Sequence, residues 1–302
     1  MRPPSRPQTY PDLVTWGTRA PGAAPSFAAR FALLRSLHGP LVFGLDPSSS
    51  LLKEWGLDDT PDGLERFVDI AVEAASGSVA VVKPQSAFYE RHGWEGIRAL
   101  ARLVDGCRSS GVLVLLDAKR GDVGSTNDAY AEAYLGHDAA LTVDGLTVTP
   151  YLGFAALRSI FERAAEAGSA IFVVTRSSNP EGRPLQQARH SDGRSVEEHL
   201  LSEIEIENMR LSCDDVGPIG AVIGPAHGSL DDVDLREVRG LFLAPGIGAQ
   251  GAGVDDVVTC FASCPDRVLP SASRSLLAAG PTVAALKRSI DELNESLVKA
   301  LG

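Results

Sequence analysis

A short run of alternating acidic and basic residues is the feature of this chain most suited to chemistry. Asp117, Lys119 and Asp122 lie in one segment, and Asp46 and Lys83 each lie at the end of an earlier apolar run. Burying an unpaired ion costs several kcal/mol, so we expect Lys83, Asp117 and Lys119 to contact one another. Such an array can hold an ammonium group ready to donate a proton or to stabilise a developing anion.

The same charges have a plainer interpretation, a structural ion pair that fills the end of the fold. Asp117 and Lys119 are two residues apart, so an extended chain points both to the same side. Asp122 comes where the chain leaves this strand. It either reaches a neighbouring subunit or caps the next helix, a role also open to Ser125 or Thr126.

Two loops in the C-terminal third have the composition of an anion site. The first, PGIGAQG, covers residues 245–251, and the second, SASRS, covers 271–275 and contains Arg274. Glycine lets the backbone approach phosphate oxygens, N–H groups at a helix start point toward them, and arginine adds a charge-assisted hydrogen bond. We therefore predict that these two loops bind a phosphate group.

Eight short apolar runs alternate with segments of helical periodicity, and these elements must position the polar residues. The alternation predicts a (β/α)₈ TIM barrel with a parallel sheet, a fold that typically needs about 250 residues. Most of the polar residues named above follow such a run, at the barrel end where enzymes of this fold carry their sites. The runs cover residues 41–46, 79–84, 112–119, 146–150, 170–175, 219–224, 241–246 and 267–271.

The chain divides into an N-terminal arm, residues 1–24, and a single barrel domain, residues 25–302. The arm is rich in proline, glycine and alanine, and we expect it to be weakly structured or docked on the barrel. Residues 179–195 are too polar and too long for an ordinary connection, which makes them a candidate lid. Helix starts are indicated at Thr60, Ser195 and Ser229. Helices are expected over 61–75, 94–109, 126–135, 154–167, 196–211, 254–261 and 281–300.

Composition excludes several classes of protein. The chain has 302 residues, 44% of them hydrophobic and 22% charged, which is typical of a globular protein. Its net charge of −11 is opposite to that of a non-specific nucleic-acid binder. The aliphatic runs are far shorter than the roughly 18 residues of a membrane span, and the N-terminus lacks the apolar stretch of a secretory signal. We expect a cytoplasmic protein.

Cysteine and histidine give no sign of a metal site. The four cysteines are too scattered for a disulfide framework, and we expect buried thiols. The six histidines lack the spacing of metal ligands, and His227 alone lies near the predicted barrel mouth. None of them is assigned a role.

The motifs resemble those of a known family. LDAKRGDVGST (116–126) resembles the signature of orotidine 5′-phosphate decarboxylase, in which Asp-x-Lys-x-x-Asp is followed four residues later by threonine. The longer, mycobacterial-type (type 2) branch has similar segments, although Val123 stands where isoleucine is common and Ser177 where threonine is frequent. The similar segments are VVKPQSAFYERHG (81–93), TPYLG (149–153), SNPEG (178–182), LAPGIGAQG (243–251) and LPSASR (269–274).

The resemblance implies a homodimeric carboxy-lyase of de novo pyrimidine biosynthesis that converts orotidine 5′-phosphate to UMP and CO₂. It implies no metal and no organic cofactor. The implied catalytic residues are Lys119, the proton donor to C6, with Asp117, Lys83 and the partner subunit's Asp122. The implied substrate-binding residues are Asp46 and Lys83 at the ribose, Thr126 reaching across the dimer, Ser178 at the pyrimidine, and Pro245, Gln250, Ser273 and Arg274, the last three at the phosphate.

Two other functions remain open from the sequence. One is a related barrel enzyme that acts on a sugar phosphate with Mg²⁺, such as a hexulose-phosphate synthase or a ketogulonate-phosphate decarboxylase. The other is a catalytically silent protein that binds UMP without turnover. Sensitivity to EDTA would indicate the first, and binding without turnover would indicate the second.

Overall fold

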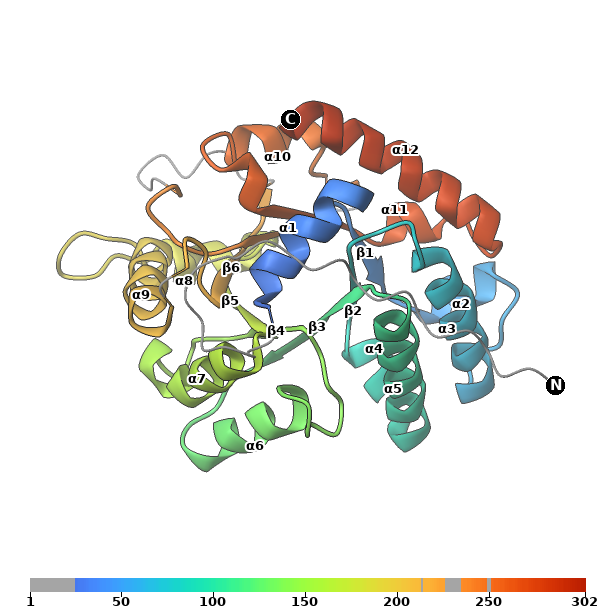
Figure 1. Cartoon of the computed structure of the whole chain (residues 1–302), viewed down its shortest axis with the longest axis horizontal. Coiled ribbons are helices and arrows are strands. Elements are labelled where there is room, and N and C mark those ends of the chain that lie inside the picture. The colour runs from blue at the N-terminus through green and yellow to red at the C-terminus, as the bar shows by residue number, and fades with distance from the viewer. Residues whose placement is uncertain (1–24, 213, 226–234, 249–250) are drawn as a thin grey trace.

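Eight parallel strands close into a barrel in chain order, β1 to β8, with helices around it (Figure 1). This computed structural model describes residues 25–302 except 213, 226–234 and 249–250, so the predicted arm, 1–24, lies outside the described residues. The predicted (β/α)₈ barrel is confirmed. The strands are β1 Val42–Leu45, β2 Val81–Pro84, β3 Leu113–Arg120, β4 Gly145–Val148, β5 Ala170–Arg176, β6 Ile219–Ile223, β7 Phe242–Pro245 and β8 Val268–Ala272.

The helices match the periodic segments of the sequence closely, and several shorter ones add to them. No helix in the described ranges is long and apolar enough to cross a bilayer. The α-helices are α1 Phe27–His38, α2 Ser49–Glu54, α3 Pro61–Ala75, α4 Ala87–Glu90, α5 Gly93–Ser109, α6 Ser125–Tyr134, α7 Arg158–Ala167, α8 Arg183–Gln186, α9 Val196–Leu211, α10 Val254–Cys260, α11 Arg274–Leu277 and α12 Val283–Leu301, and the 3₁₀ turns include Phe154–Leu157, Pro180–Gly182 and Pro265–Arg267.

Side-chain caps fix two of the predicted helix starts. The Thr60 hydroxyl accepts a hydrogen bond from Gly63 N at the start of α3. At the start of α9, the Ser195 hydroxyl accepts from Glu198 N while the Glu198 carboxylate accepts from Ser195 N. Both arrangements satisfy N–H groups that a helix leaves unpaired. The third predicted start, Ser229, lies outside the described residues.

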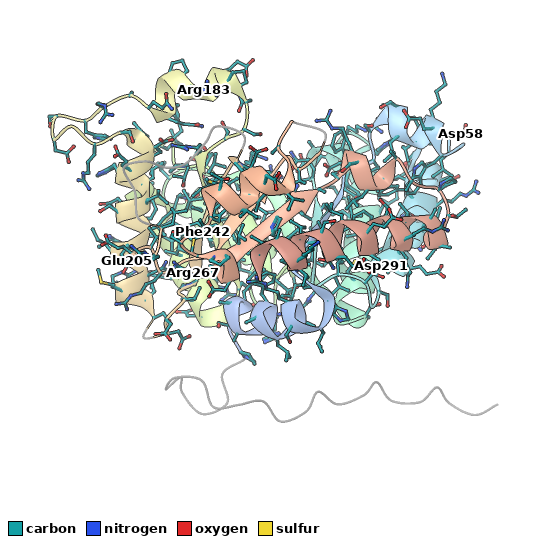
Figure 2. All side chains as sticks on the ribbon, turned by 90° about the horizontal axis from the view of Figure 1, so that it is seen from above. Asp58, Arg183, Glu205, Phe242, Arg267 and Asp291 are labelled. Atoms are coloured by element: carbon teal, nitrogen blue, oxygen red, sulfur yellow. The ribbon has the colours of Figure 1, made fainter. Side chains whose placement is uncertain are left out.

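Helix α1, which the sequence analysis did not predict, closes the N-terminal end of the barrel. Its Phe27 and Phe31 are buried, and the Phe27 ring packs edge-on against Phe172 of β5, with ring centroids 5.9 Å apart. Figure 1 shows α1 across the barrel, and Figure 2 shows it on the opposite side from Asp58 and Arg183. The other end of the barrel is therefore left for the functional site.

Candidate active site

Three charged side chains from neighbouring strands meet at the C-terminal end of the barrel. Lys83 Nζ on β2 lies 3.1 Å from Asp117 Oδ2 on β3, and Lys119 Nζ lies 2.6 Å from Asp117 Oδ1. The side chains of Lys83 and Asp117 are 8% and 13% exposed, whereas that of Lys119 is 48% exposed. The expected contact between the three residues is confirmed, with Lys119 the member that solvent or a ligand can reach.

The ionised forms of Asp117 and Lys83 stabilise each other. Burial raises the pKa of Asp117, but the charges of Lys83 and Lys119 and the hydrogen bonds to the carboxylate outweigh it and lower that pKa to about 2. Burial lowers the pKa of Lys83, but the carboxylates of Asp117 and Asp46 more than offset this, so its pKa is raised. At neutral pH both residues are charged.

This coupling predicts a loss of stability in acid. Because the folded-state pKa of Asp117 is lowered from 3.8 to about 2, its ionised form stabilises the fold above pH about 4, and that contribution is lost as the pH falls toward 2. The shift corresponds to roughly 2 kcal/mol. Urea unfolding of the wild type and Asp117→Asn should give free energies whose difference shrinks between about pH 5 and pH 2.5. Parallel curves over that range would contradict the prediction.

The backbone at Lys119 departs from a regular strand. Its φ is +46°, the only positive φ among the non-glycine residues that the structure describes. The left-handed region costs a non-glycine residue of order 1–3 kcal/mol. Asp117 and Lys119 do form the pair expected from the cost of burying unpaired ions, but the regular extended backbone from which their shared side was predicted is interrupted at Lys119.

Asp122 lies in the loop between β3 and α6 and does not cap the helix. The N-cap of α6 is Gly124, so the helix-capping interpretations of Asp122, Ser125 and Thr126 were wrong. Instead, the buried Asn127 side chain accepts from Asp122 N over 2.9 Å and donates to Asp122 O over 2.5 Å. No ion pair joins Asp122 to a base within the described part of the chain. Thr126 is exposed in the first turn of α6.

The two loops predicted to bind phosphate lie side by side. Gly246 and Gly248 have φ values of +96° and +81°, which glycine adopts without strain. Ile247 N donates to Ser271 O over 3.3 Å, which ties the loop after β7 to β8. Pro245 ends β7, and Ser273 and Arg274 begin α11. Gln250 lies outside the described residues.

Two buried polar atoms near this end of the barrel have no hydrogen-bond partner among the described residues: Asp46 Oδ1, just after β1, and Ser273 Oγ, just after β8. These strands approach closely, since a Cβ on Gly44 would lie 2.6 Å from Ser273 Cβ. Buried polar atoms normally have partners, so these two atoms are available to hydrogen-bond a ligand at this end of the barrel. Ser178 follows β5, half-buried against the backbone of Gly224.

The residues that hold this array in place were not predicted from the sequence. Thr147 of β4 donates to Asp117 Oδ1 over 2.8 Å. The Gln85 amide, in the orientation that satisfies its neighbours, donates to Asp117 Oδ2 over 3.2 Å. Asn127 holds the loop of Asp122, as described above. Thr147 interrupts an apolar run, and this hydroxyl was the available signal; Gln85 and Asn127 gave none.

The candidate lid, 179–195, is anchored at both ends. Gln186 of α8 accepts from Ser177 N over 3.1 Å, at the end of β5. The buried Arg176 side chain donates to the two carboxylate oxygens of Glu197, over 2.9 Å for its Nε. This pair joins the last residue of β5 to the first turn of α9. Figure 2 shows Arg183 of this segment standing out from the barrel.

Known proteins are similar to this chain in both sequence and fold. A family model described as orotidine 5′-phosphate decarboxylase / HUMPS family matches residues 39–289. The chain belongs to this family. An orotidine 5′-phosphate decarboxylase of Salinispora arenicola is 47% identical over 268 residues, which cover 89% of this chain and 95% of the relative. A second, from Myxococcus xanthus, is 47% identical over 266 residues, 88% of this chain and 92% of the relative.

The similar solved structures are assigned to the same enzyme, orotidine 5′-phosphate decarboxylase, as the sequence relatives. A crystal structure from Streptomyces avermitilis, assigned to orotidine 5′-phosphate decarboxylase, superposes with a TM-score of 0.88 at 44% identity and covers 94% of this chain and 99% of its own. The structure of Leishmania donovani OMP decarboxylase has a TM-score of 0.71 at 28% identity, with coverages of 91% and 99%. The family model alone also includes the HUMPS enzymes, but the relatives at 47% identity are all orotidine 5′-phosphate decarboxylases, and this similarity makes the chain a carboxy-lyase, as the resemblance implied.

Proposed function

We propose that this chain converts orotidine 5′-phosphate to UMP and CO₂, with Lys119 as the proton donor. The observation that carries the proposal is the Lys83–Asp117–Lys119 array at the barrel mouth. The bond between C6 and the carboxyl carbon breaks and its electron pair stays on C6. Lys119 Nζ then gives C6 the proton that replaces CO₂, and it recovers a proton from solvent.

The charged array acts mainly by electrostatics. The partly exposed ammonium of Lys119, held by Asp117, lies where it can stabilise negative charge on C6 before the proton moves. General acid catalysis typically contributes about 10²–10⁴, whereas difficult reactions need up to about 10¹⁷. The rest must come from preorganised charges and from binding energy at the distant phosphate, which also closes the 179–195 segment over the substrate.

The unpartnered oxygen of Asp46 supports a role in holding the ribose hydroxyls, together with Lys83. The adjoining loops after β7 and β8 support a phosphate site. In this proposal Ser178 contacts the pyrimidine, Pro245 lines the substrate, and Gln250, the Ser273 backbone and Arg274 bind the phosphate. No metal or organic cofactor takes part. We also infer that the chain belongs to the longer branch of the family. As an enzyme of nucleotide biosynthesis, it would act in the cytoplasm.

The active site is shared across a homodimer in this proposal, and Asp122 and Thr126 serve the partner's substrate. The exposed apolar side chains beside them support an interface: Val123 is 54% exposed, Tyr151 76% and Leu152 56%. Large apolar side chains exposed in neighbouring loops are typical of surfaces that a partner covers. Asn127 would then fix the loop that carries Asp122 to the neighbouring subunit.

Replacing Arg274 should weaken binding of phosphate-bearing ligands. Loss of a charge-assisted hydrogen bond costs about 1.5–3 kcal/mol, so Arg274→Ala should bind UMP about 10- to 100-fold more weakly. Calorimetric titration with UMP measures this, and uridine, which lacks the phosphate, should bind both proteins alike. Arg288→Ala, on the exposed face of α12, is the matched control. Unchanged UMP affinity in Arg274→Ala would contradict the phosphate assignment.

The activity itself is tested by following the ultraviolet absorbance of orotidine 5′-phosphate mixed with the purified protein. We expect the orotate absorbance to fall at the same rate with and without EDTA. A rate abolished by EDTA and restored by Mg²⁺ would instead favour the alternative of a Mg²⁺-dependent barrel enzyme related to those that act on sugar phosphates. Folded protein that binds UMP but leaves the absorbance unchanged would be the silent binder.

A further inference from the structure

The irregular part of β3 faces a single residue of β4. Leu116 pairs with Leu146, and the next pair in register is Arg120 with Val148. Three residues of β3 therefore lie opposite Thr147 alone. A bulge of this kind leaves backbone N–H groups without their regular partners in the sheet, and such groups need another acceptor when they are buried.

The Thr147 hydroxyl satisfies all three opposing residues. It accepts from Ala118 N over 3.0 Å and from Lys119 N over 2.9 Å, and it donates to Asp117 Oδ1 over 2.8 Å. A threonine hydroxyl offers one donor and two acceptor sites, so its capacity is fully used. Thr147 is 1% exposed, so its hydroxyl makes these three bonds within the protein and not with solvent.

These bonds restrain Asp117 and Lys119, two of the three charged residues in the array. Lys119 keeps its φ of +46° only while its surroundings hold it, and the bond from its N–H is one of those restraints. Asp117 Oδ1 accepts from both the Thr147 hydroxyl and Lys119 Nζ. The hydroxyl oxygen of Thr147 thus holds both the backbone of Lys119 and the Asp117 carboxylate to which the Lys119 ammonium binds.

We propose that Thr147 is a positioning residue that sets the direction of the Lys119 ammonium through the bulge of β3. The inference rests on the proposed role of Lys119 as proton donor. Thr147 itself is packed behind the array and acts through Asp117 and Lys119. Its hydroxyl, rather than its volume, is the group that matters.

Thr147→Val keeps the shape of the side chain and removes the hydroxyl. Misplacing a reacting group by about 1 Å can cost on the order of 10²-fold in rate, so we expect kcat to fall about 10- to 100-fold. KM for orotidine 5′-phosphate should stay within about threefold, because no binding group is touched. Thr147→Ser should restore kcat to within about threefold of the wild type, since serine offers the same donor and acceptors.

The control is Thr175→Val, the same change at a buried threonine of β5 whose hydroxyl donates to Val173 O. Thermal melting and UMP titration of all variants separate a positioning effect from a loss of fold. Equal losses of kcat in Thr147→Val and Thr175→Val, or a Thr147→Ser variant as slow as Thr147→Val, would overturn the proposal. So would a Thr147→Val enzyme with unchanged kcat.

A crystal structure of Thr147→Val gives a readout that does not depend on turnover. The expected result is a changed φ at Lys119 and a Lys119 Nζ to Asp117 Oδ1 distance longer than 2.6 Å. An unchanged bulge would overturn the positioning role even if the variant were slow. Absence of decarboxylation by the wild type would instead count against the proposed function, so the two failures are distinguishable.

Discussion

Lys119→Ala should lose decarboxylation by at least about 10⁴-fold and still bind UMP, because the change removes both the proton donor and the cation nearest the developing charge. The substrate-binding groups proposed at the ends of β1, β7 and β8 are untouched. The measurement is the fall in orotate absorbance, with calorimetric titration of UMP on the same preparation. We expect no measurable turnover beside readily measured binding.

Lys299→Ala is the matched control, since this lysine is exposed on α12, away from the strand ends. It should have wild-type turnover. Substantial turnover in Lys119→Ala would remove Lys119 from the role of donor. Loss of UMP binding together with turnover, in a variant that still melts cooperatively, would place Lys119 in substrate binding instead.

Mixing two inactive variants tests the shared site. In a dimer whose sites each combine Lys119 of one subunit with Asp122 of the other, a heterodimer of Lys119→Ala and Asp122→Asn has one doubly substituted site and one intact site. Random exchange in an equal mixture makes half of the dimers mixed, so about a quarter of the wild-type activity should return. The measurement is turnover before and after subunit exchange.

The matched control is a mixture of Lys119→Ala and Asp117→Asn. Both residues belong to the array within one chain, where they are 2.6 Å apart, so no heterodimer of this pair contains an intact site. This mixture should stay inactive. No recovery in the first mixture, once exchange has been shown by mass spectrometry, would contradict a shared site, and equal recovery in both mixtures would do the same.

The sequence predicted the barrel well because its strands are buried on both faces. Such strands are continuous apolar runs, and all eight runs became strands within a few residues of the expected bounds. The array was predictable for a related reason, since Lys83 and Asp117 stand in apolar surroundings and had to pair. Helix α1 was missed because apolar residues lie on its exposed side as well as its buried one, Leu37 among them, so the segment has no clear apolar stripe.

What could not be predicted is how neighbouring strands meet. The alternation of side-chain directions along the sequence of β3 describes a regular strand. The position of Lys119 depends instead on the register of β3 against β4, which no local pattern specifies. The hydroxyl of Thr147 within an apolar run therefore marked a polar position without showing which residues it would contact. The support that Asn127 gives to the loop of Asp122 depends in the same way on a contact formed only after folding.

The buried pair of Arg176 and Glu197 also bears on how this protein can change over evolution. It joins the two residues that flank segment 177–196, which contains the candidate lid, and so closes a loop whose ends are fixed whatever the length between them. The entropy of closing a loop rises only by about 0.6 kcal/mol for each doubling of length. Insertions and deletions between these anchors should therefore leave the barrel intact, which makes this segment the place where related enzymes can diverge in size at little cost in stability.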